Sequence, residues 1–172
     1  MDHDTEVLIV GAGIAGASLA AFLSQTRRVV LLEAESQPGY HSTGRSAAMF
    51  MESYGTATIR ALTRASRAFF ENPPAGFAAT PLLAPRGALY VGARGQRDML
   101  DALEAELRPH TPRLRRLPAA EALARVPVLR PEQVDGALLD PDAADIDVHS
   151  LHQGFLRRAK ANGARLITDA RV

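Results

Sequence analysis

A glycine-rich turn between two apolar segments constrains the fold of this 172-residue chain more than any other feature. The turn, Gly11 to Gly16, has the pattern G-x-G-x-x-G and follows Val7 to Val10, a short apolar run typical of a buried strand. It opens an alanine-rich stretch of high helix propensity, Ile14 to Leu23, and a second apolar run, Val29 to Glu33, comes next. This order predicts a βαβ unit with a right-handed crossover, and therefore a parallel sheet.

Each part of this unit suits the binding of an adenine dinucleotide. Gly11 allows a tight turn, Gly13 lets backbone N–H groups approach a pyrophosphate, and Gly16 lets helix and strand pack closely. The helix N-terminus adds a partial positive charge. Glu33, which ends the second strand, can accept hydrogen bonds from ribose hydroxyls, and its charge would repel the 2′-phosphate of NADP. The alternative is that the glycines serve packing alone and Glu33 is a solvated strand end.

The loop after the second strand favours FAD over NAD. An NAD-binding domain usually continues there into another helix and strand, whereas this chain runs through Pro38 into GYHSTGRSAAMFMESYG, residues 39–55. Small residues permit close backbone approach, and hydroxyl groups offer hydrogen bonds to a cofactor that extends past its pyrophosphate. The apolar tail, Met49 to Met51, would line a pocket beside a flat ring. A solvated surface loop is the alternative.

The middle of the chain has a different character. Asn72-Pro73-Pro74 ends a predicted amphipathic helix, Gly87 to Val91 predicts a strand, and Leu100 to Leu107 predicts a second amphipathic helix. All 11 prolines except Pro38 lie between Pro73 and Pro141, which argues against a place in the parallel core. We therefore predict an inserted domain.

The pattern then returns to that of the first part. Asp147 is a candidate N-cap, Asn162-Gly163 closes the helix that follows, and Ala164 to Thr168 predicts a strand. We predict an α/β fold, in which residues 1–52 and 143–172 form a Rossmann-like FAD-binding βαβ parallel sheet. Residues 53–142 form the first segment of an inserted α+β substrate domain. Neither domain is completed by Val172, so we expect the front part of a larger protein.

Composition narrows the functional classes further. The net charge is +1 with no block of like charge, which gives no indication of nucleic-acid binding. The chain has no cysteine, so thiolate metal ligands and disulfides are excluded, and no metal site is predicted. The absence of a long apolar run predicts no transmembrane segment, and a cytoplasmic location is expected, with peripheral association at the inner membrane left open.

VLIVGAGIAGASLA and VVLLEAESQPGYHSTGRSAA strongly resemble the D-amino-acid oxidase-like (DAO) family of FAD-dependent oxidoreductases. The likeness is closest to the bacterial D-arginine or broad-specificity D-amino acid dehydrogenases. It continues through RAFFENPPAGF and LHQGFLRRAKANGA and so covers practically the whole chain. The glycine turn is generic, whereas QPGYHSTGRSAA and RAFFENPPAGF are specific.

The resemblance implies particular contacts. Val172 would contact the adenine through its backbone, and Tyr54 would reach the substrate side of the flavin, although an ordinary half-buried tyrosine is the alternative. FAD contacts are implied at Ala15, Glu33, Ala34, Ser42, Thr43, Gly44, Arg45, Ser46, Ala47, Ala48 and Met49.

Two departures from close relatives concern the substrate. Met49 stands where those relatives have a histidine, and Ala88 stands where members that favour cationic substrates have a glutamate. A buried cation without a carboxylate partner is costly. We therefore expect uncharged amino acids to be preferred over arginine or lysine.

The implied reaction is oxidative deamination of an amino acid, with a D-amino acid favoured, to a 2-oxo acid and ammonia. Glycine, sarcosine or 2-hydroxy acids are alternative substrates, and a non-catalytic cofactor-binding fragment is another reading, since the isolated chain is not expected to turn over. The electron acceptor, a quinone or oxygen, and the catalytic residues stay open. His149 and His152 are predicted to lie on a solvated helix face.

Overall fold

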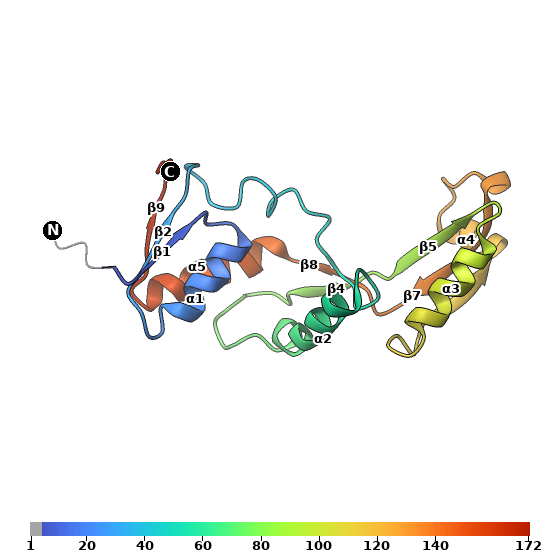
Figure 1. Cartoon of the computed structure of the whole chain (residues 1–172), viewed down its shortest axis with the longest axis horizontal. Coiled ribbons are helices and arrows are strands. Elements are labelled where there is room, and N and C mark those ends of the chain that lie inside the picture. Colours follow the sequence, from blue (N-terminus) through green and yellow to red (C-terminus); the bar gives the residue numbers. More distant parts are fainter. Residues whose placement is uncertain (1–4) are drawn as a thin grey trace. The chain divides into compact units, whose positions relative to one another are not determined.

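A computed structural model describes residues 5–172 of the chain, which divide into two compact units (Figure 1). The first unit contains the residues up to Ala48 together with 68–82 and 146–172, and the second contains 49–67 and 83–145. Residues 68–82 were predicted to lie in the inserted domain, whereas their contacts group them with the first unit. The assignment of a cofactor domain and a substrate domain stays a prediction.

The first unit is built on the predicted βαβ arrangement. Its three strands are parallel and lie in the order β1-β2-β9, with Val7 opposite Val29 and Leu31 opposite Leu166. The elements of this unit are β1 (Val7–Val10), α1 (Ile14–Leu23), β2 (Val29–Leu32), α5 (Val148–Ala161) and β9 (Arg165–Ile167). The α/β fold with a parallel sheet is therefore confirmed.

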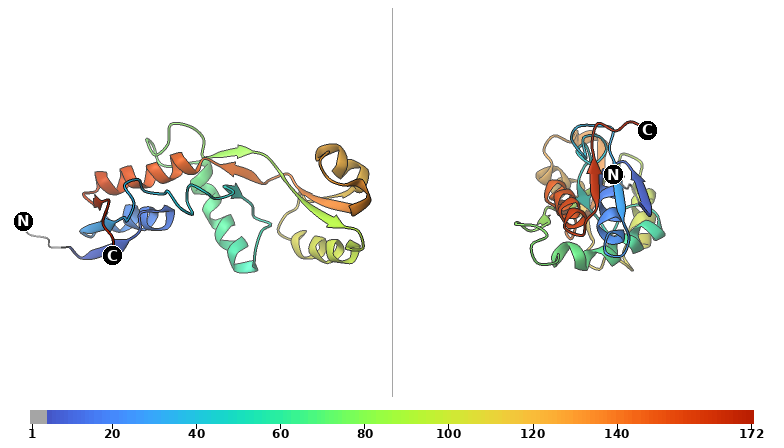
Figure 2. Two further views of the ribbon diagram at one scale, coloured as in Figure 1. Left: turned by 90° about the horizontal axis from the view of Figure 1, so that it is seen from above. Right: turned by 90° about the vertical axis from the view of Figure 1, so that its left-hand side faces the viewer.

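Helices α1 and α5 pack side by side against one face of this sheet (Figures 1 and 2). Ala17 and Ala20 of α1 are fully buried in that core, where their small side chains allow the two helices to approach closely. On the opposite face, Leu8 is 55% and Val10 64% exposed. The strand predicted to be buried is thus covered on a single face among the described residues, although parallel sheets are usually covered on both.

Aromatic packing joins residues 68–82 to the first unit. The rings of Phe69 and Phe155 stack with centroids 5.6 Å apart, and Phe77 meets Phe155 edge-on at 5.0 Å. Offset and edge-to-face pairs of this kind are favourable beyond the area that they bury. Phe155 lies on α5, so this cluster packs the end of α2 (Ala57–Glu71) and the segment after it into the core.

Helix α5 begins and ends where the sequence predicts. Asp147 is its N-cap, and its carboxylate accepts a hydrogen bond of 2.8 Å from the Ser150 N–H. This bond is the main reason that the pKa of Asp147 is lowered. At the other end, Gly163 adopts a positive φ of 88°, which favours glycine.

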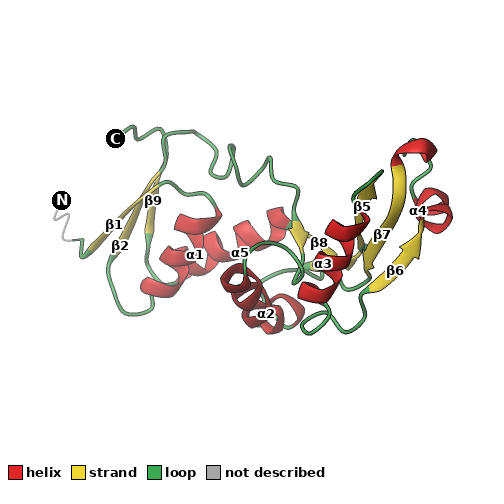
Figure 3. Ribbon diagram, turned by 45° about the vertical axis from the view of Figure 1, so that its right-hand side comes forward, coloured by secondary structure: helices red, strands yellow, loops and turns green. Residues whose placement is uncertain are grey.

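The second unit is antiparallel, which agrees with the prediction that this proline-containing region lies outside the parallel core. Its main sheet has the order β5-β7-β6 (Figure 3). Tyr90 of β5 lies opposite Leu138 of β7. Helix α3 packs on the face that carries Leu138, and α4 packs on the face that carries Ala137. The elements of this sheet are β5 (Ala88–Ala93), α3 (Arg97–Leu107), β6 (Arg115–Pro118), α4 (Ala119–Arg125), the 3-10 helix η1 (Pro131–Gln133) and β7 (Val134–Asp140).

Three very short strands form a separate small sheet in the order β3-β8-β4. They are β3 (Met49–Phe50), β4 (Leu83–Pro85) and β8 (Ala144–Ile146). None of the helices formed by residues 5–172 combines the length and apolarity needed to cross a bilayer.

Candidate functional site

The glycine turn connects β1 to α1 with little room for side chains. Gly11 has a φ of 90°, and a Cβ built on Gly16 would lie 1.9 Å from the Gly11 carbonyl oxygen. Gly13 is the N-cap of α1 and offers no side chain to cap it. The first N–H groups of an α-helix have no intrahelical partners, so the turn presents donors and a positive dipole end to an anionic ligand.

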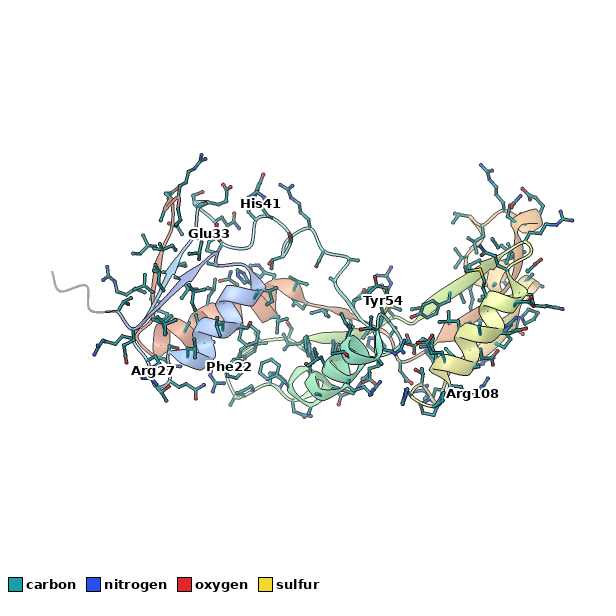
Figure 4. The ribbon with its side chains drawn as sticks, viewed as in Figure 1. Phe22, Arg27, Glu33, His41, Tyr54 and Arg108 are labelled. Atoms are coloured by element: carbon teal, nitrogen blue, oxygen red, sulfur yellow. The ribbon has the colours of Figure 1, made fainter. Side chains whose placement is uncertain are left out.

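Glu33 is held at the end of β2 by the backbone of two other segments (Figure 4). Its Oε2 accepts a hydrogen bond of 2.8 Å from the Ala12 N–H, and its Oε1 accepts one of 3.0 Å from the Glu35 N–H. The bond from Glu35 is the largest cause of the lowered pKa of Glu33, and that from Ala12 adds to it. The ionised carboxylate keeps further lone pairs for ribose hydroxyls.

The lowered pKa of Glu33 makes its contribution to stability depend on pH. A depressed folded-state pKa means that this stability is fully present above the usual value of 4.5 and is lost as the pH falls through the folded-state pKa. We expect Glu33→Gln to lower the free energy of unfolding at pH 7 and the deficit to shrink steadily below pH 4.5. Urea titrations across this range measure the deficit. A deficit that is independent of pH, or one matched by the exposed-site control Glu132→Gln, would contradict the assignment.

The cofactor loop, defined as residues 39–48, is tied to the glycine turn. The Thr43 Oγ1 accepts a hydrogen bond of 2.9 Å from the Ile14 N–H. A side chain at position 13 would crowd this hydroxyl, because a Cβ built on Gly13 would lie 3.0 Å from the Thr43 Oγ1. Gly13 therefore gives the Thr43 hydroxyl access to the helix N-terminus. Within the loop, the Gly44 N–H donates to the Gly39 carbonyl at 2.8 Å.

Most residues of the cofactor loop present their surface outward. Ser42, Gly44, Arg45, Ser46 and Ala47 are exposed, while Thr43 and Ala48 are half-buried. The loop and the beginning of α5 line a half-open cavity of about 570 Å³, whose walls include Thr43, Arg45, Ala48, Val148 and Gln153. A cavity of this volume is typical of small-molecule and cofactor sites.

The remaining cofactor candidates lie at three further places. Ala15 is exposed in the first turn of α1, and Ala34 is exposed just after Glu33. The Ala170 N–H donates to the Glu33 carbonyl at 2.9 Å, which brings the chain that ends at Val172 beside the end of β2. Met49 differs from the other residues predicted to contact FAD, because it begins β3 and belongs to the second unit, whereas the others belong to the first.

Tyr54 and Ala88, the two residues predicted on the substrate side, both lie near Asp140, which was not predicted as a site residue. Asp140 is 1% exposed and lies opposite Ala88 in the β5–β7 pairing. Its Oδ2 accepts a hydrogen bond of 2.5 Å from the Ser53 Oγ, and Ser53 directly precedes Tyr54, which is 65% exposed. An aspartate at a strand end usually faces solvent, so the sequence offered no signal for its burial.

Tyr90 completes this buried network. Its hydroxyl lies 2.9 Å from the Ser53 Oγ. Because the single Ser53 proton is given to the Asp140 carboxylate, Tyr90 must be the donor in its own bond to Ser53. Burial, and secondarily the Asp140 charge, raise the pKa of Tyr90. Tyr90 therefore stays protonated at neutral pH.

The prediction for His152 was wrong. The side chain is 4% exposed and its Nε2 lies 2.7 Å from the Ala12 carbonyl oxygen, whereas His149 is exposed as predicted. The helical spacing of His152, Phe155 and Ala159 places all three on the buried face of α5. That spacing was visible in the sequence and was the signal that could have located His152.

Known proteins with this fold share its architecture over nearly the whole chain. The model of the FAD dependent oxidoreductase family, DAO, matches residues 6–172. Glycine oxidase from Geobacillus kaustophilus superimposes with a TM-score of 0.83 at 22% identity, covering 99% of this chain and 48% of that one. Iminodiacetate oxidase from Chelativorans sp. BNC1 gives 0.72 at 28% identity, covering 95% and 46%.

A third similar structure contains the cofactor. L-alpha-glycerophosphate oxidase from Mycoplasma pneumoniae, with FAD bound, gives a TM-score of 0.80 at 20% identity and covers 98% of this chain and 45% of that one. The chain thus spans less than half the length of each of these three structures.

The residues present fit FAD. The N-terminus of α1 has no side-chain cap from Gly13 and is free of acidic side chains in its first turn, which suits a pyrophosphate. The ionised Glu33 lies beside it for a ribose, and Thr43 connects the turn to the cofactor loop. The chain therefore belongs to the FAD dependent oxidoreductase family, and FAD is its cofactor.

Proposed function

We propose that this chain is part of an enzyme that oxidatively deaminates an amino acid, with D-amino acids of uncharged side chain preferred. The family match over residues 6–172 carries the proposal. Bound FAD supplies a hydride acceptor, its N5 atom, for the hydrogen on the substrate Cα. Loss of that hydride and a proton leaves an imino acid, which water converts to a 2-oxo acid and ammonia, and a quinone or oxygen takes the electrons as the final acceptor.

The residues of this chain bind and orient the reactants in this proposal. Residues 1–52 and 143–172 would hold FAD, with the segment from Ser42 to Met49 along the cofactor. Residues 53–142 would contribute to the substrate side, where the exposed Tyr54 projects from the segment anchored by Ser53. Fixing the substrate Cα close to the flavin is the main task of such a site.

The surroundings of Ala88 support the preference for uncharged substrates. Ala88 supplies no carboxylate, and the carboxylate of the neighbouring Asp140 is buried and engaged by the Ser53 Oγ and the Asp142 N–H. A substrate guanidinium or ammonium group at Ala88 would therefore lack an accessible partner among these residues, and leaving a cation unpaired is costly.

A substrate panel tests the proposed reaction. The complete FAD-loaded enzyme of which this chain is part is given D- and L-alanine, D-valine, D-leucine, D-arginine, glycine, sarcosine, iminodiacetate and 2-hydroxy acids, and 2-oxo acid and ammonia are both quantified. We expect equal amounts of the two products from apolar D-amino acids. D-arginine as the best substrate would contradict the charge preference, and oxidation of 2-hydroxy acids without ammonia would contradict deamination.

Within the same panel, Ala88→Glu reports on the substrate-side position. The added carboxylate is expected to raise kcat/KM for D-arginine relative to D-leucine by about tenfold or more, because charge pairs at desolvated contacts couple by at least ~1.5 kcal/mol. The control is Ala93→Glu at the other end of β5. An equal change in the ratio of kcat/KM for D-arginine to that for D-leucine in both variants would mean that Ala88 does not lie beside the substrate.

A second candidate is oxidation of glycine or an N-substituted glycine. The similarity to iminodiacetate oxidase at 28% identity favours it, since iminodiacetate is a secondary amine. Sarcosine or iminodiacetate as the best substrate in the panel would support this candidate over D-amino acid deamination.

A further inference from the structure

His152 connects the glycine turn to the first residue of the cofactor loop. It lies on α5, more than a hundred positions along the chain from either segment. Its Nε2 is 2.7 Å from the Ala12 carbonyl oxygen, and the imidazole lies against Gly39. A single buried side chain thus contacts both segments for which FAD contacts are predicted.

The hydrogen bond fixes which nitrogen of His152 carries a proton. A carbonyl oxygen can only accept, so Nε2 must be the donor to Ala12. The N–H of the same residue, Ala12, donates to the Glu33 Oε2 at 2.8 Å. Ala12 is therefore held from both sides: its N–H by Glu33, which directly follows β2, and its carbonyl by His152 of α5.

The contact with Gly39 is equally restrictive. A Cβ at Gly39 would come within 2.9 Å of the His152 Cε1 and 3.1 Å of its Nδ1. Gly39 also has a φ of 82°, in the region that favours glycine, and its carbonyl accepts the hydrogen bond from the Gly44 N–H. The imidazole thus sets how closely the beginning of the loop approaches α5.

We propose that His152 is a positioning residue for FAD. It acts through Ala12 and Gly39 and does not need to contact the cofactor itself. By holding the Ala12 carbonyl and packing against Gly39, it keeps the turn and the loop in the geometry that the cofactor requires. Loss of the Nε2 donor would leave the buried Ala12 carbonyl without this partner and let the turn relax. The effect is expected on FAD affinity more than on the stability of the apoprotein.

Two substitutions separate this role from simple packing. His152→Gln keeps an N–H donor close to the position of Nε2, whereas His152→Leu fills similar space without a donor. FAD is removed from the purified holoprotein, and its dissociation constant is measured by quenching of flavin fluorescence on rebinding. The visible spectrum of the bound flavin and the urea midpoint of the apoprotein are recorded for each variant.

We expect His152→Leu to weaken FAD binding by about tenfold, the effect of losing one hydrogen bond, and His152→Gln to stay within about threefold of the parent. The control His110→Leu replaces an exposed histidine of the second unit and should change neither quantity. Equal affinities for the Leu and Gln variants would overturn the proposal, as would an unchanged affinity in the Leu variant.

Gly39→Ala tests the same contact from the loop side if His152→Leu does not fold. The added methyl group would meet the imidazole, so FAD affinity should fall and the bound-flavin spectrum should shift. Parental affinity and spectrum in a folded Gly39→Ala protein would overturn the proposal.

Discussion

Gly16→Ala is expected to abolish FAD binding and to lower the free energy of unfolding by more than about 3 kcal/mol. Some dinucleotide-binding turns accept alanine at the third glycine position. Here, however, the new Cβ would lie 1.9 Å from the Gly11 carbonyl oxygen and 3.2 Å from the Ile9 Cγ2. Because the closest atom belongs to the backbone, a rotamer change cannot relieve the clash, and α1 would have to move away from the turn. Flavin content after purification and urea titration measure the two effects.

Two further variants provide comparisons for the stability loss and flavin content of Gly16→Ala. Gly11→Ala meets no atom within 4 Å but must adopt a φ of 90°, so it should cost only about 1–2 kcal/mol. Leu19→Ala alters a side chain of α1 that is 49% exposed and should leave flavin content unchanged. A Gly16→Ala protein that retains FAD and loses no more stability than Gly11→Ala would show that the turn can open to admit a side chain.

The parallel sheet could be predicted because local signals and packing agree there. The apolar runs that form β1 and β2, and the glycines between them, leave few alternatives to a βαβ unit. Asp147 and Gly163 mark the ends of α5 by capping chemistry that acts within a few residues. Such features depend on neighbours in sequence, so a single chain contains the information.

The second unit was predicted less completely because its elements depend on distant partners. Strand β7 contains Asp135, Gly136 and Asp140, which are residues of low strand propensity. Its pairing with β5 and β6 is what orders it. Strand β6 and helix α4 lie in the proline-containing region and were missed for the same reason. Asp140 and His152 are polar residues whose burial depends on Ser53 and Ala12, far away in sequence. Periodicity can indicate a buried face but cannot name these partners.

Asp140→Ala is expected to lower the free energy of unfolding by about 3 kcal/mol or more. The substitution removes the acceptor of two hydrogen bonds, from the buried Ser53 hydroxyl and the half-buried Asp142 N–H, and an unpaired buried donor costs ~1–3 kcal/mol. Asp140 is 1% exposed, so the space left behind adds a cavity cost. Urea unfolding of the holoprotein, followed by circular dichroism, gives the free energy directly.

The neighbouring Asp142 provides a matched control two positions along the chain. Its side chain pairs with Arg113 at 2.7 Å, an ion pair in which the arginine side chain is 69% exposed, and Asp142→Ala keeps the backbone N–H that Asp140 accepts. Exposed pairs of this kind contribute ~0–1 kcal/mol, so its loss should be small. Asp140→Asn should fall between the two, because the amide keeps the volume and one acceptor oxygen but cannot accept on its nitrogen side. Equal losses for Asp140→Ala and Asp142→Ala would mean that the network of Ser53, Tyr90 and Asp140 does not hold the segment that carries Tyr54.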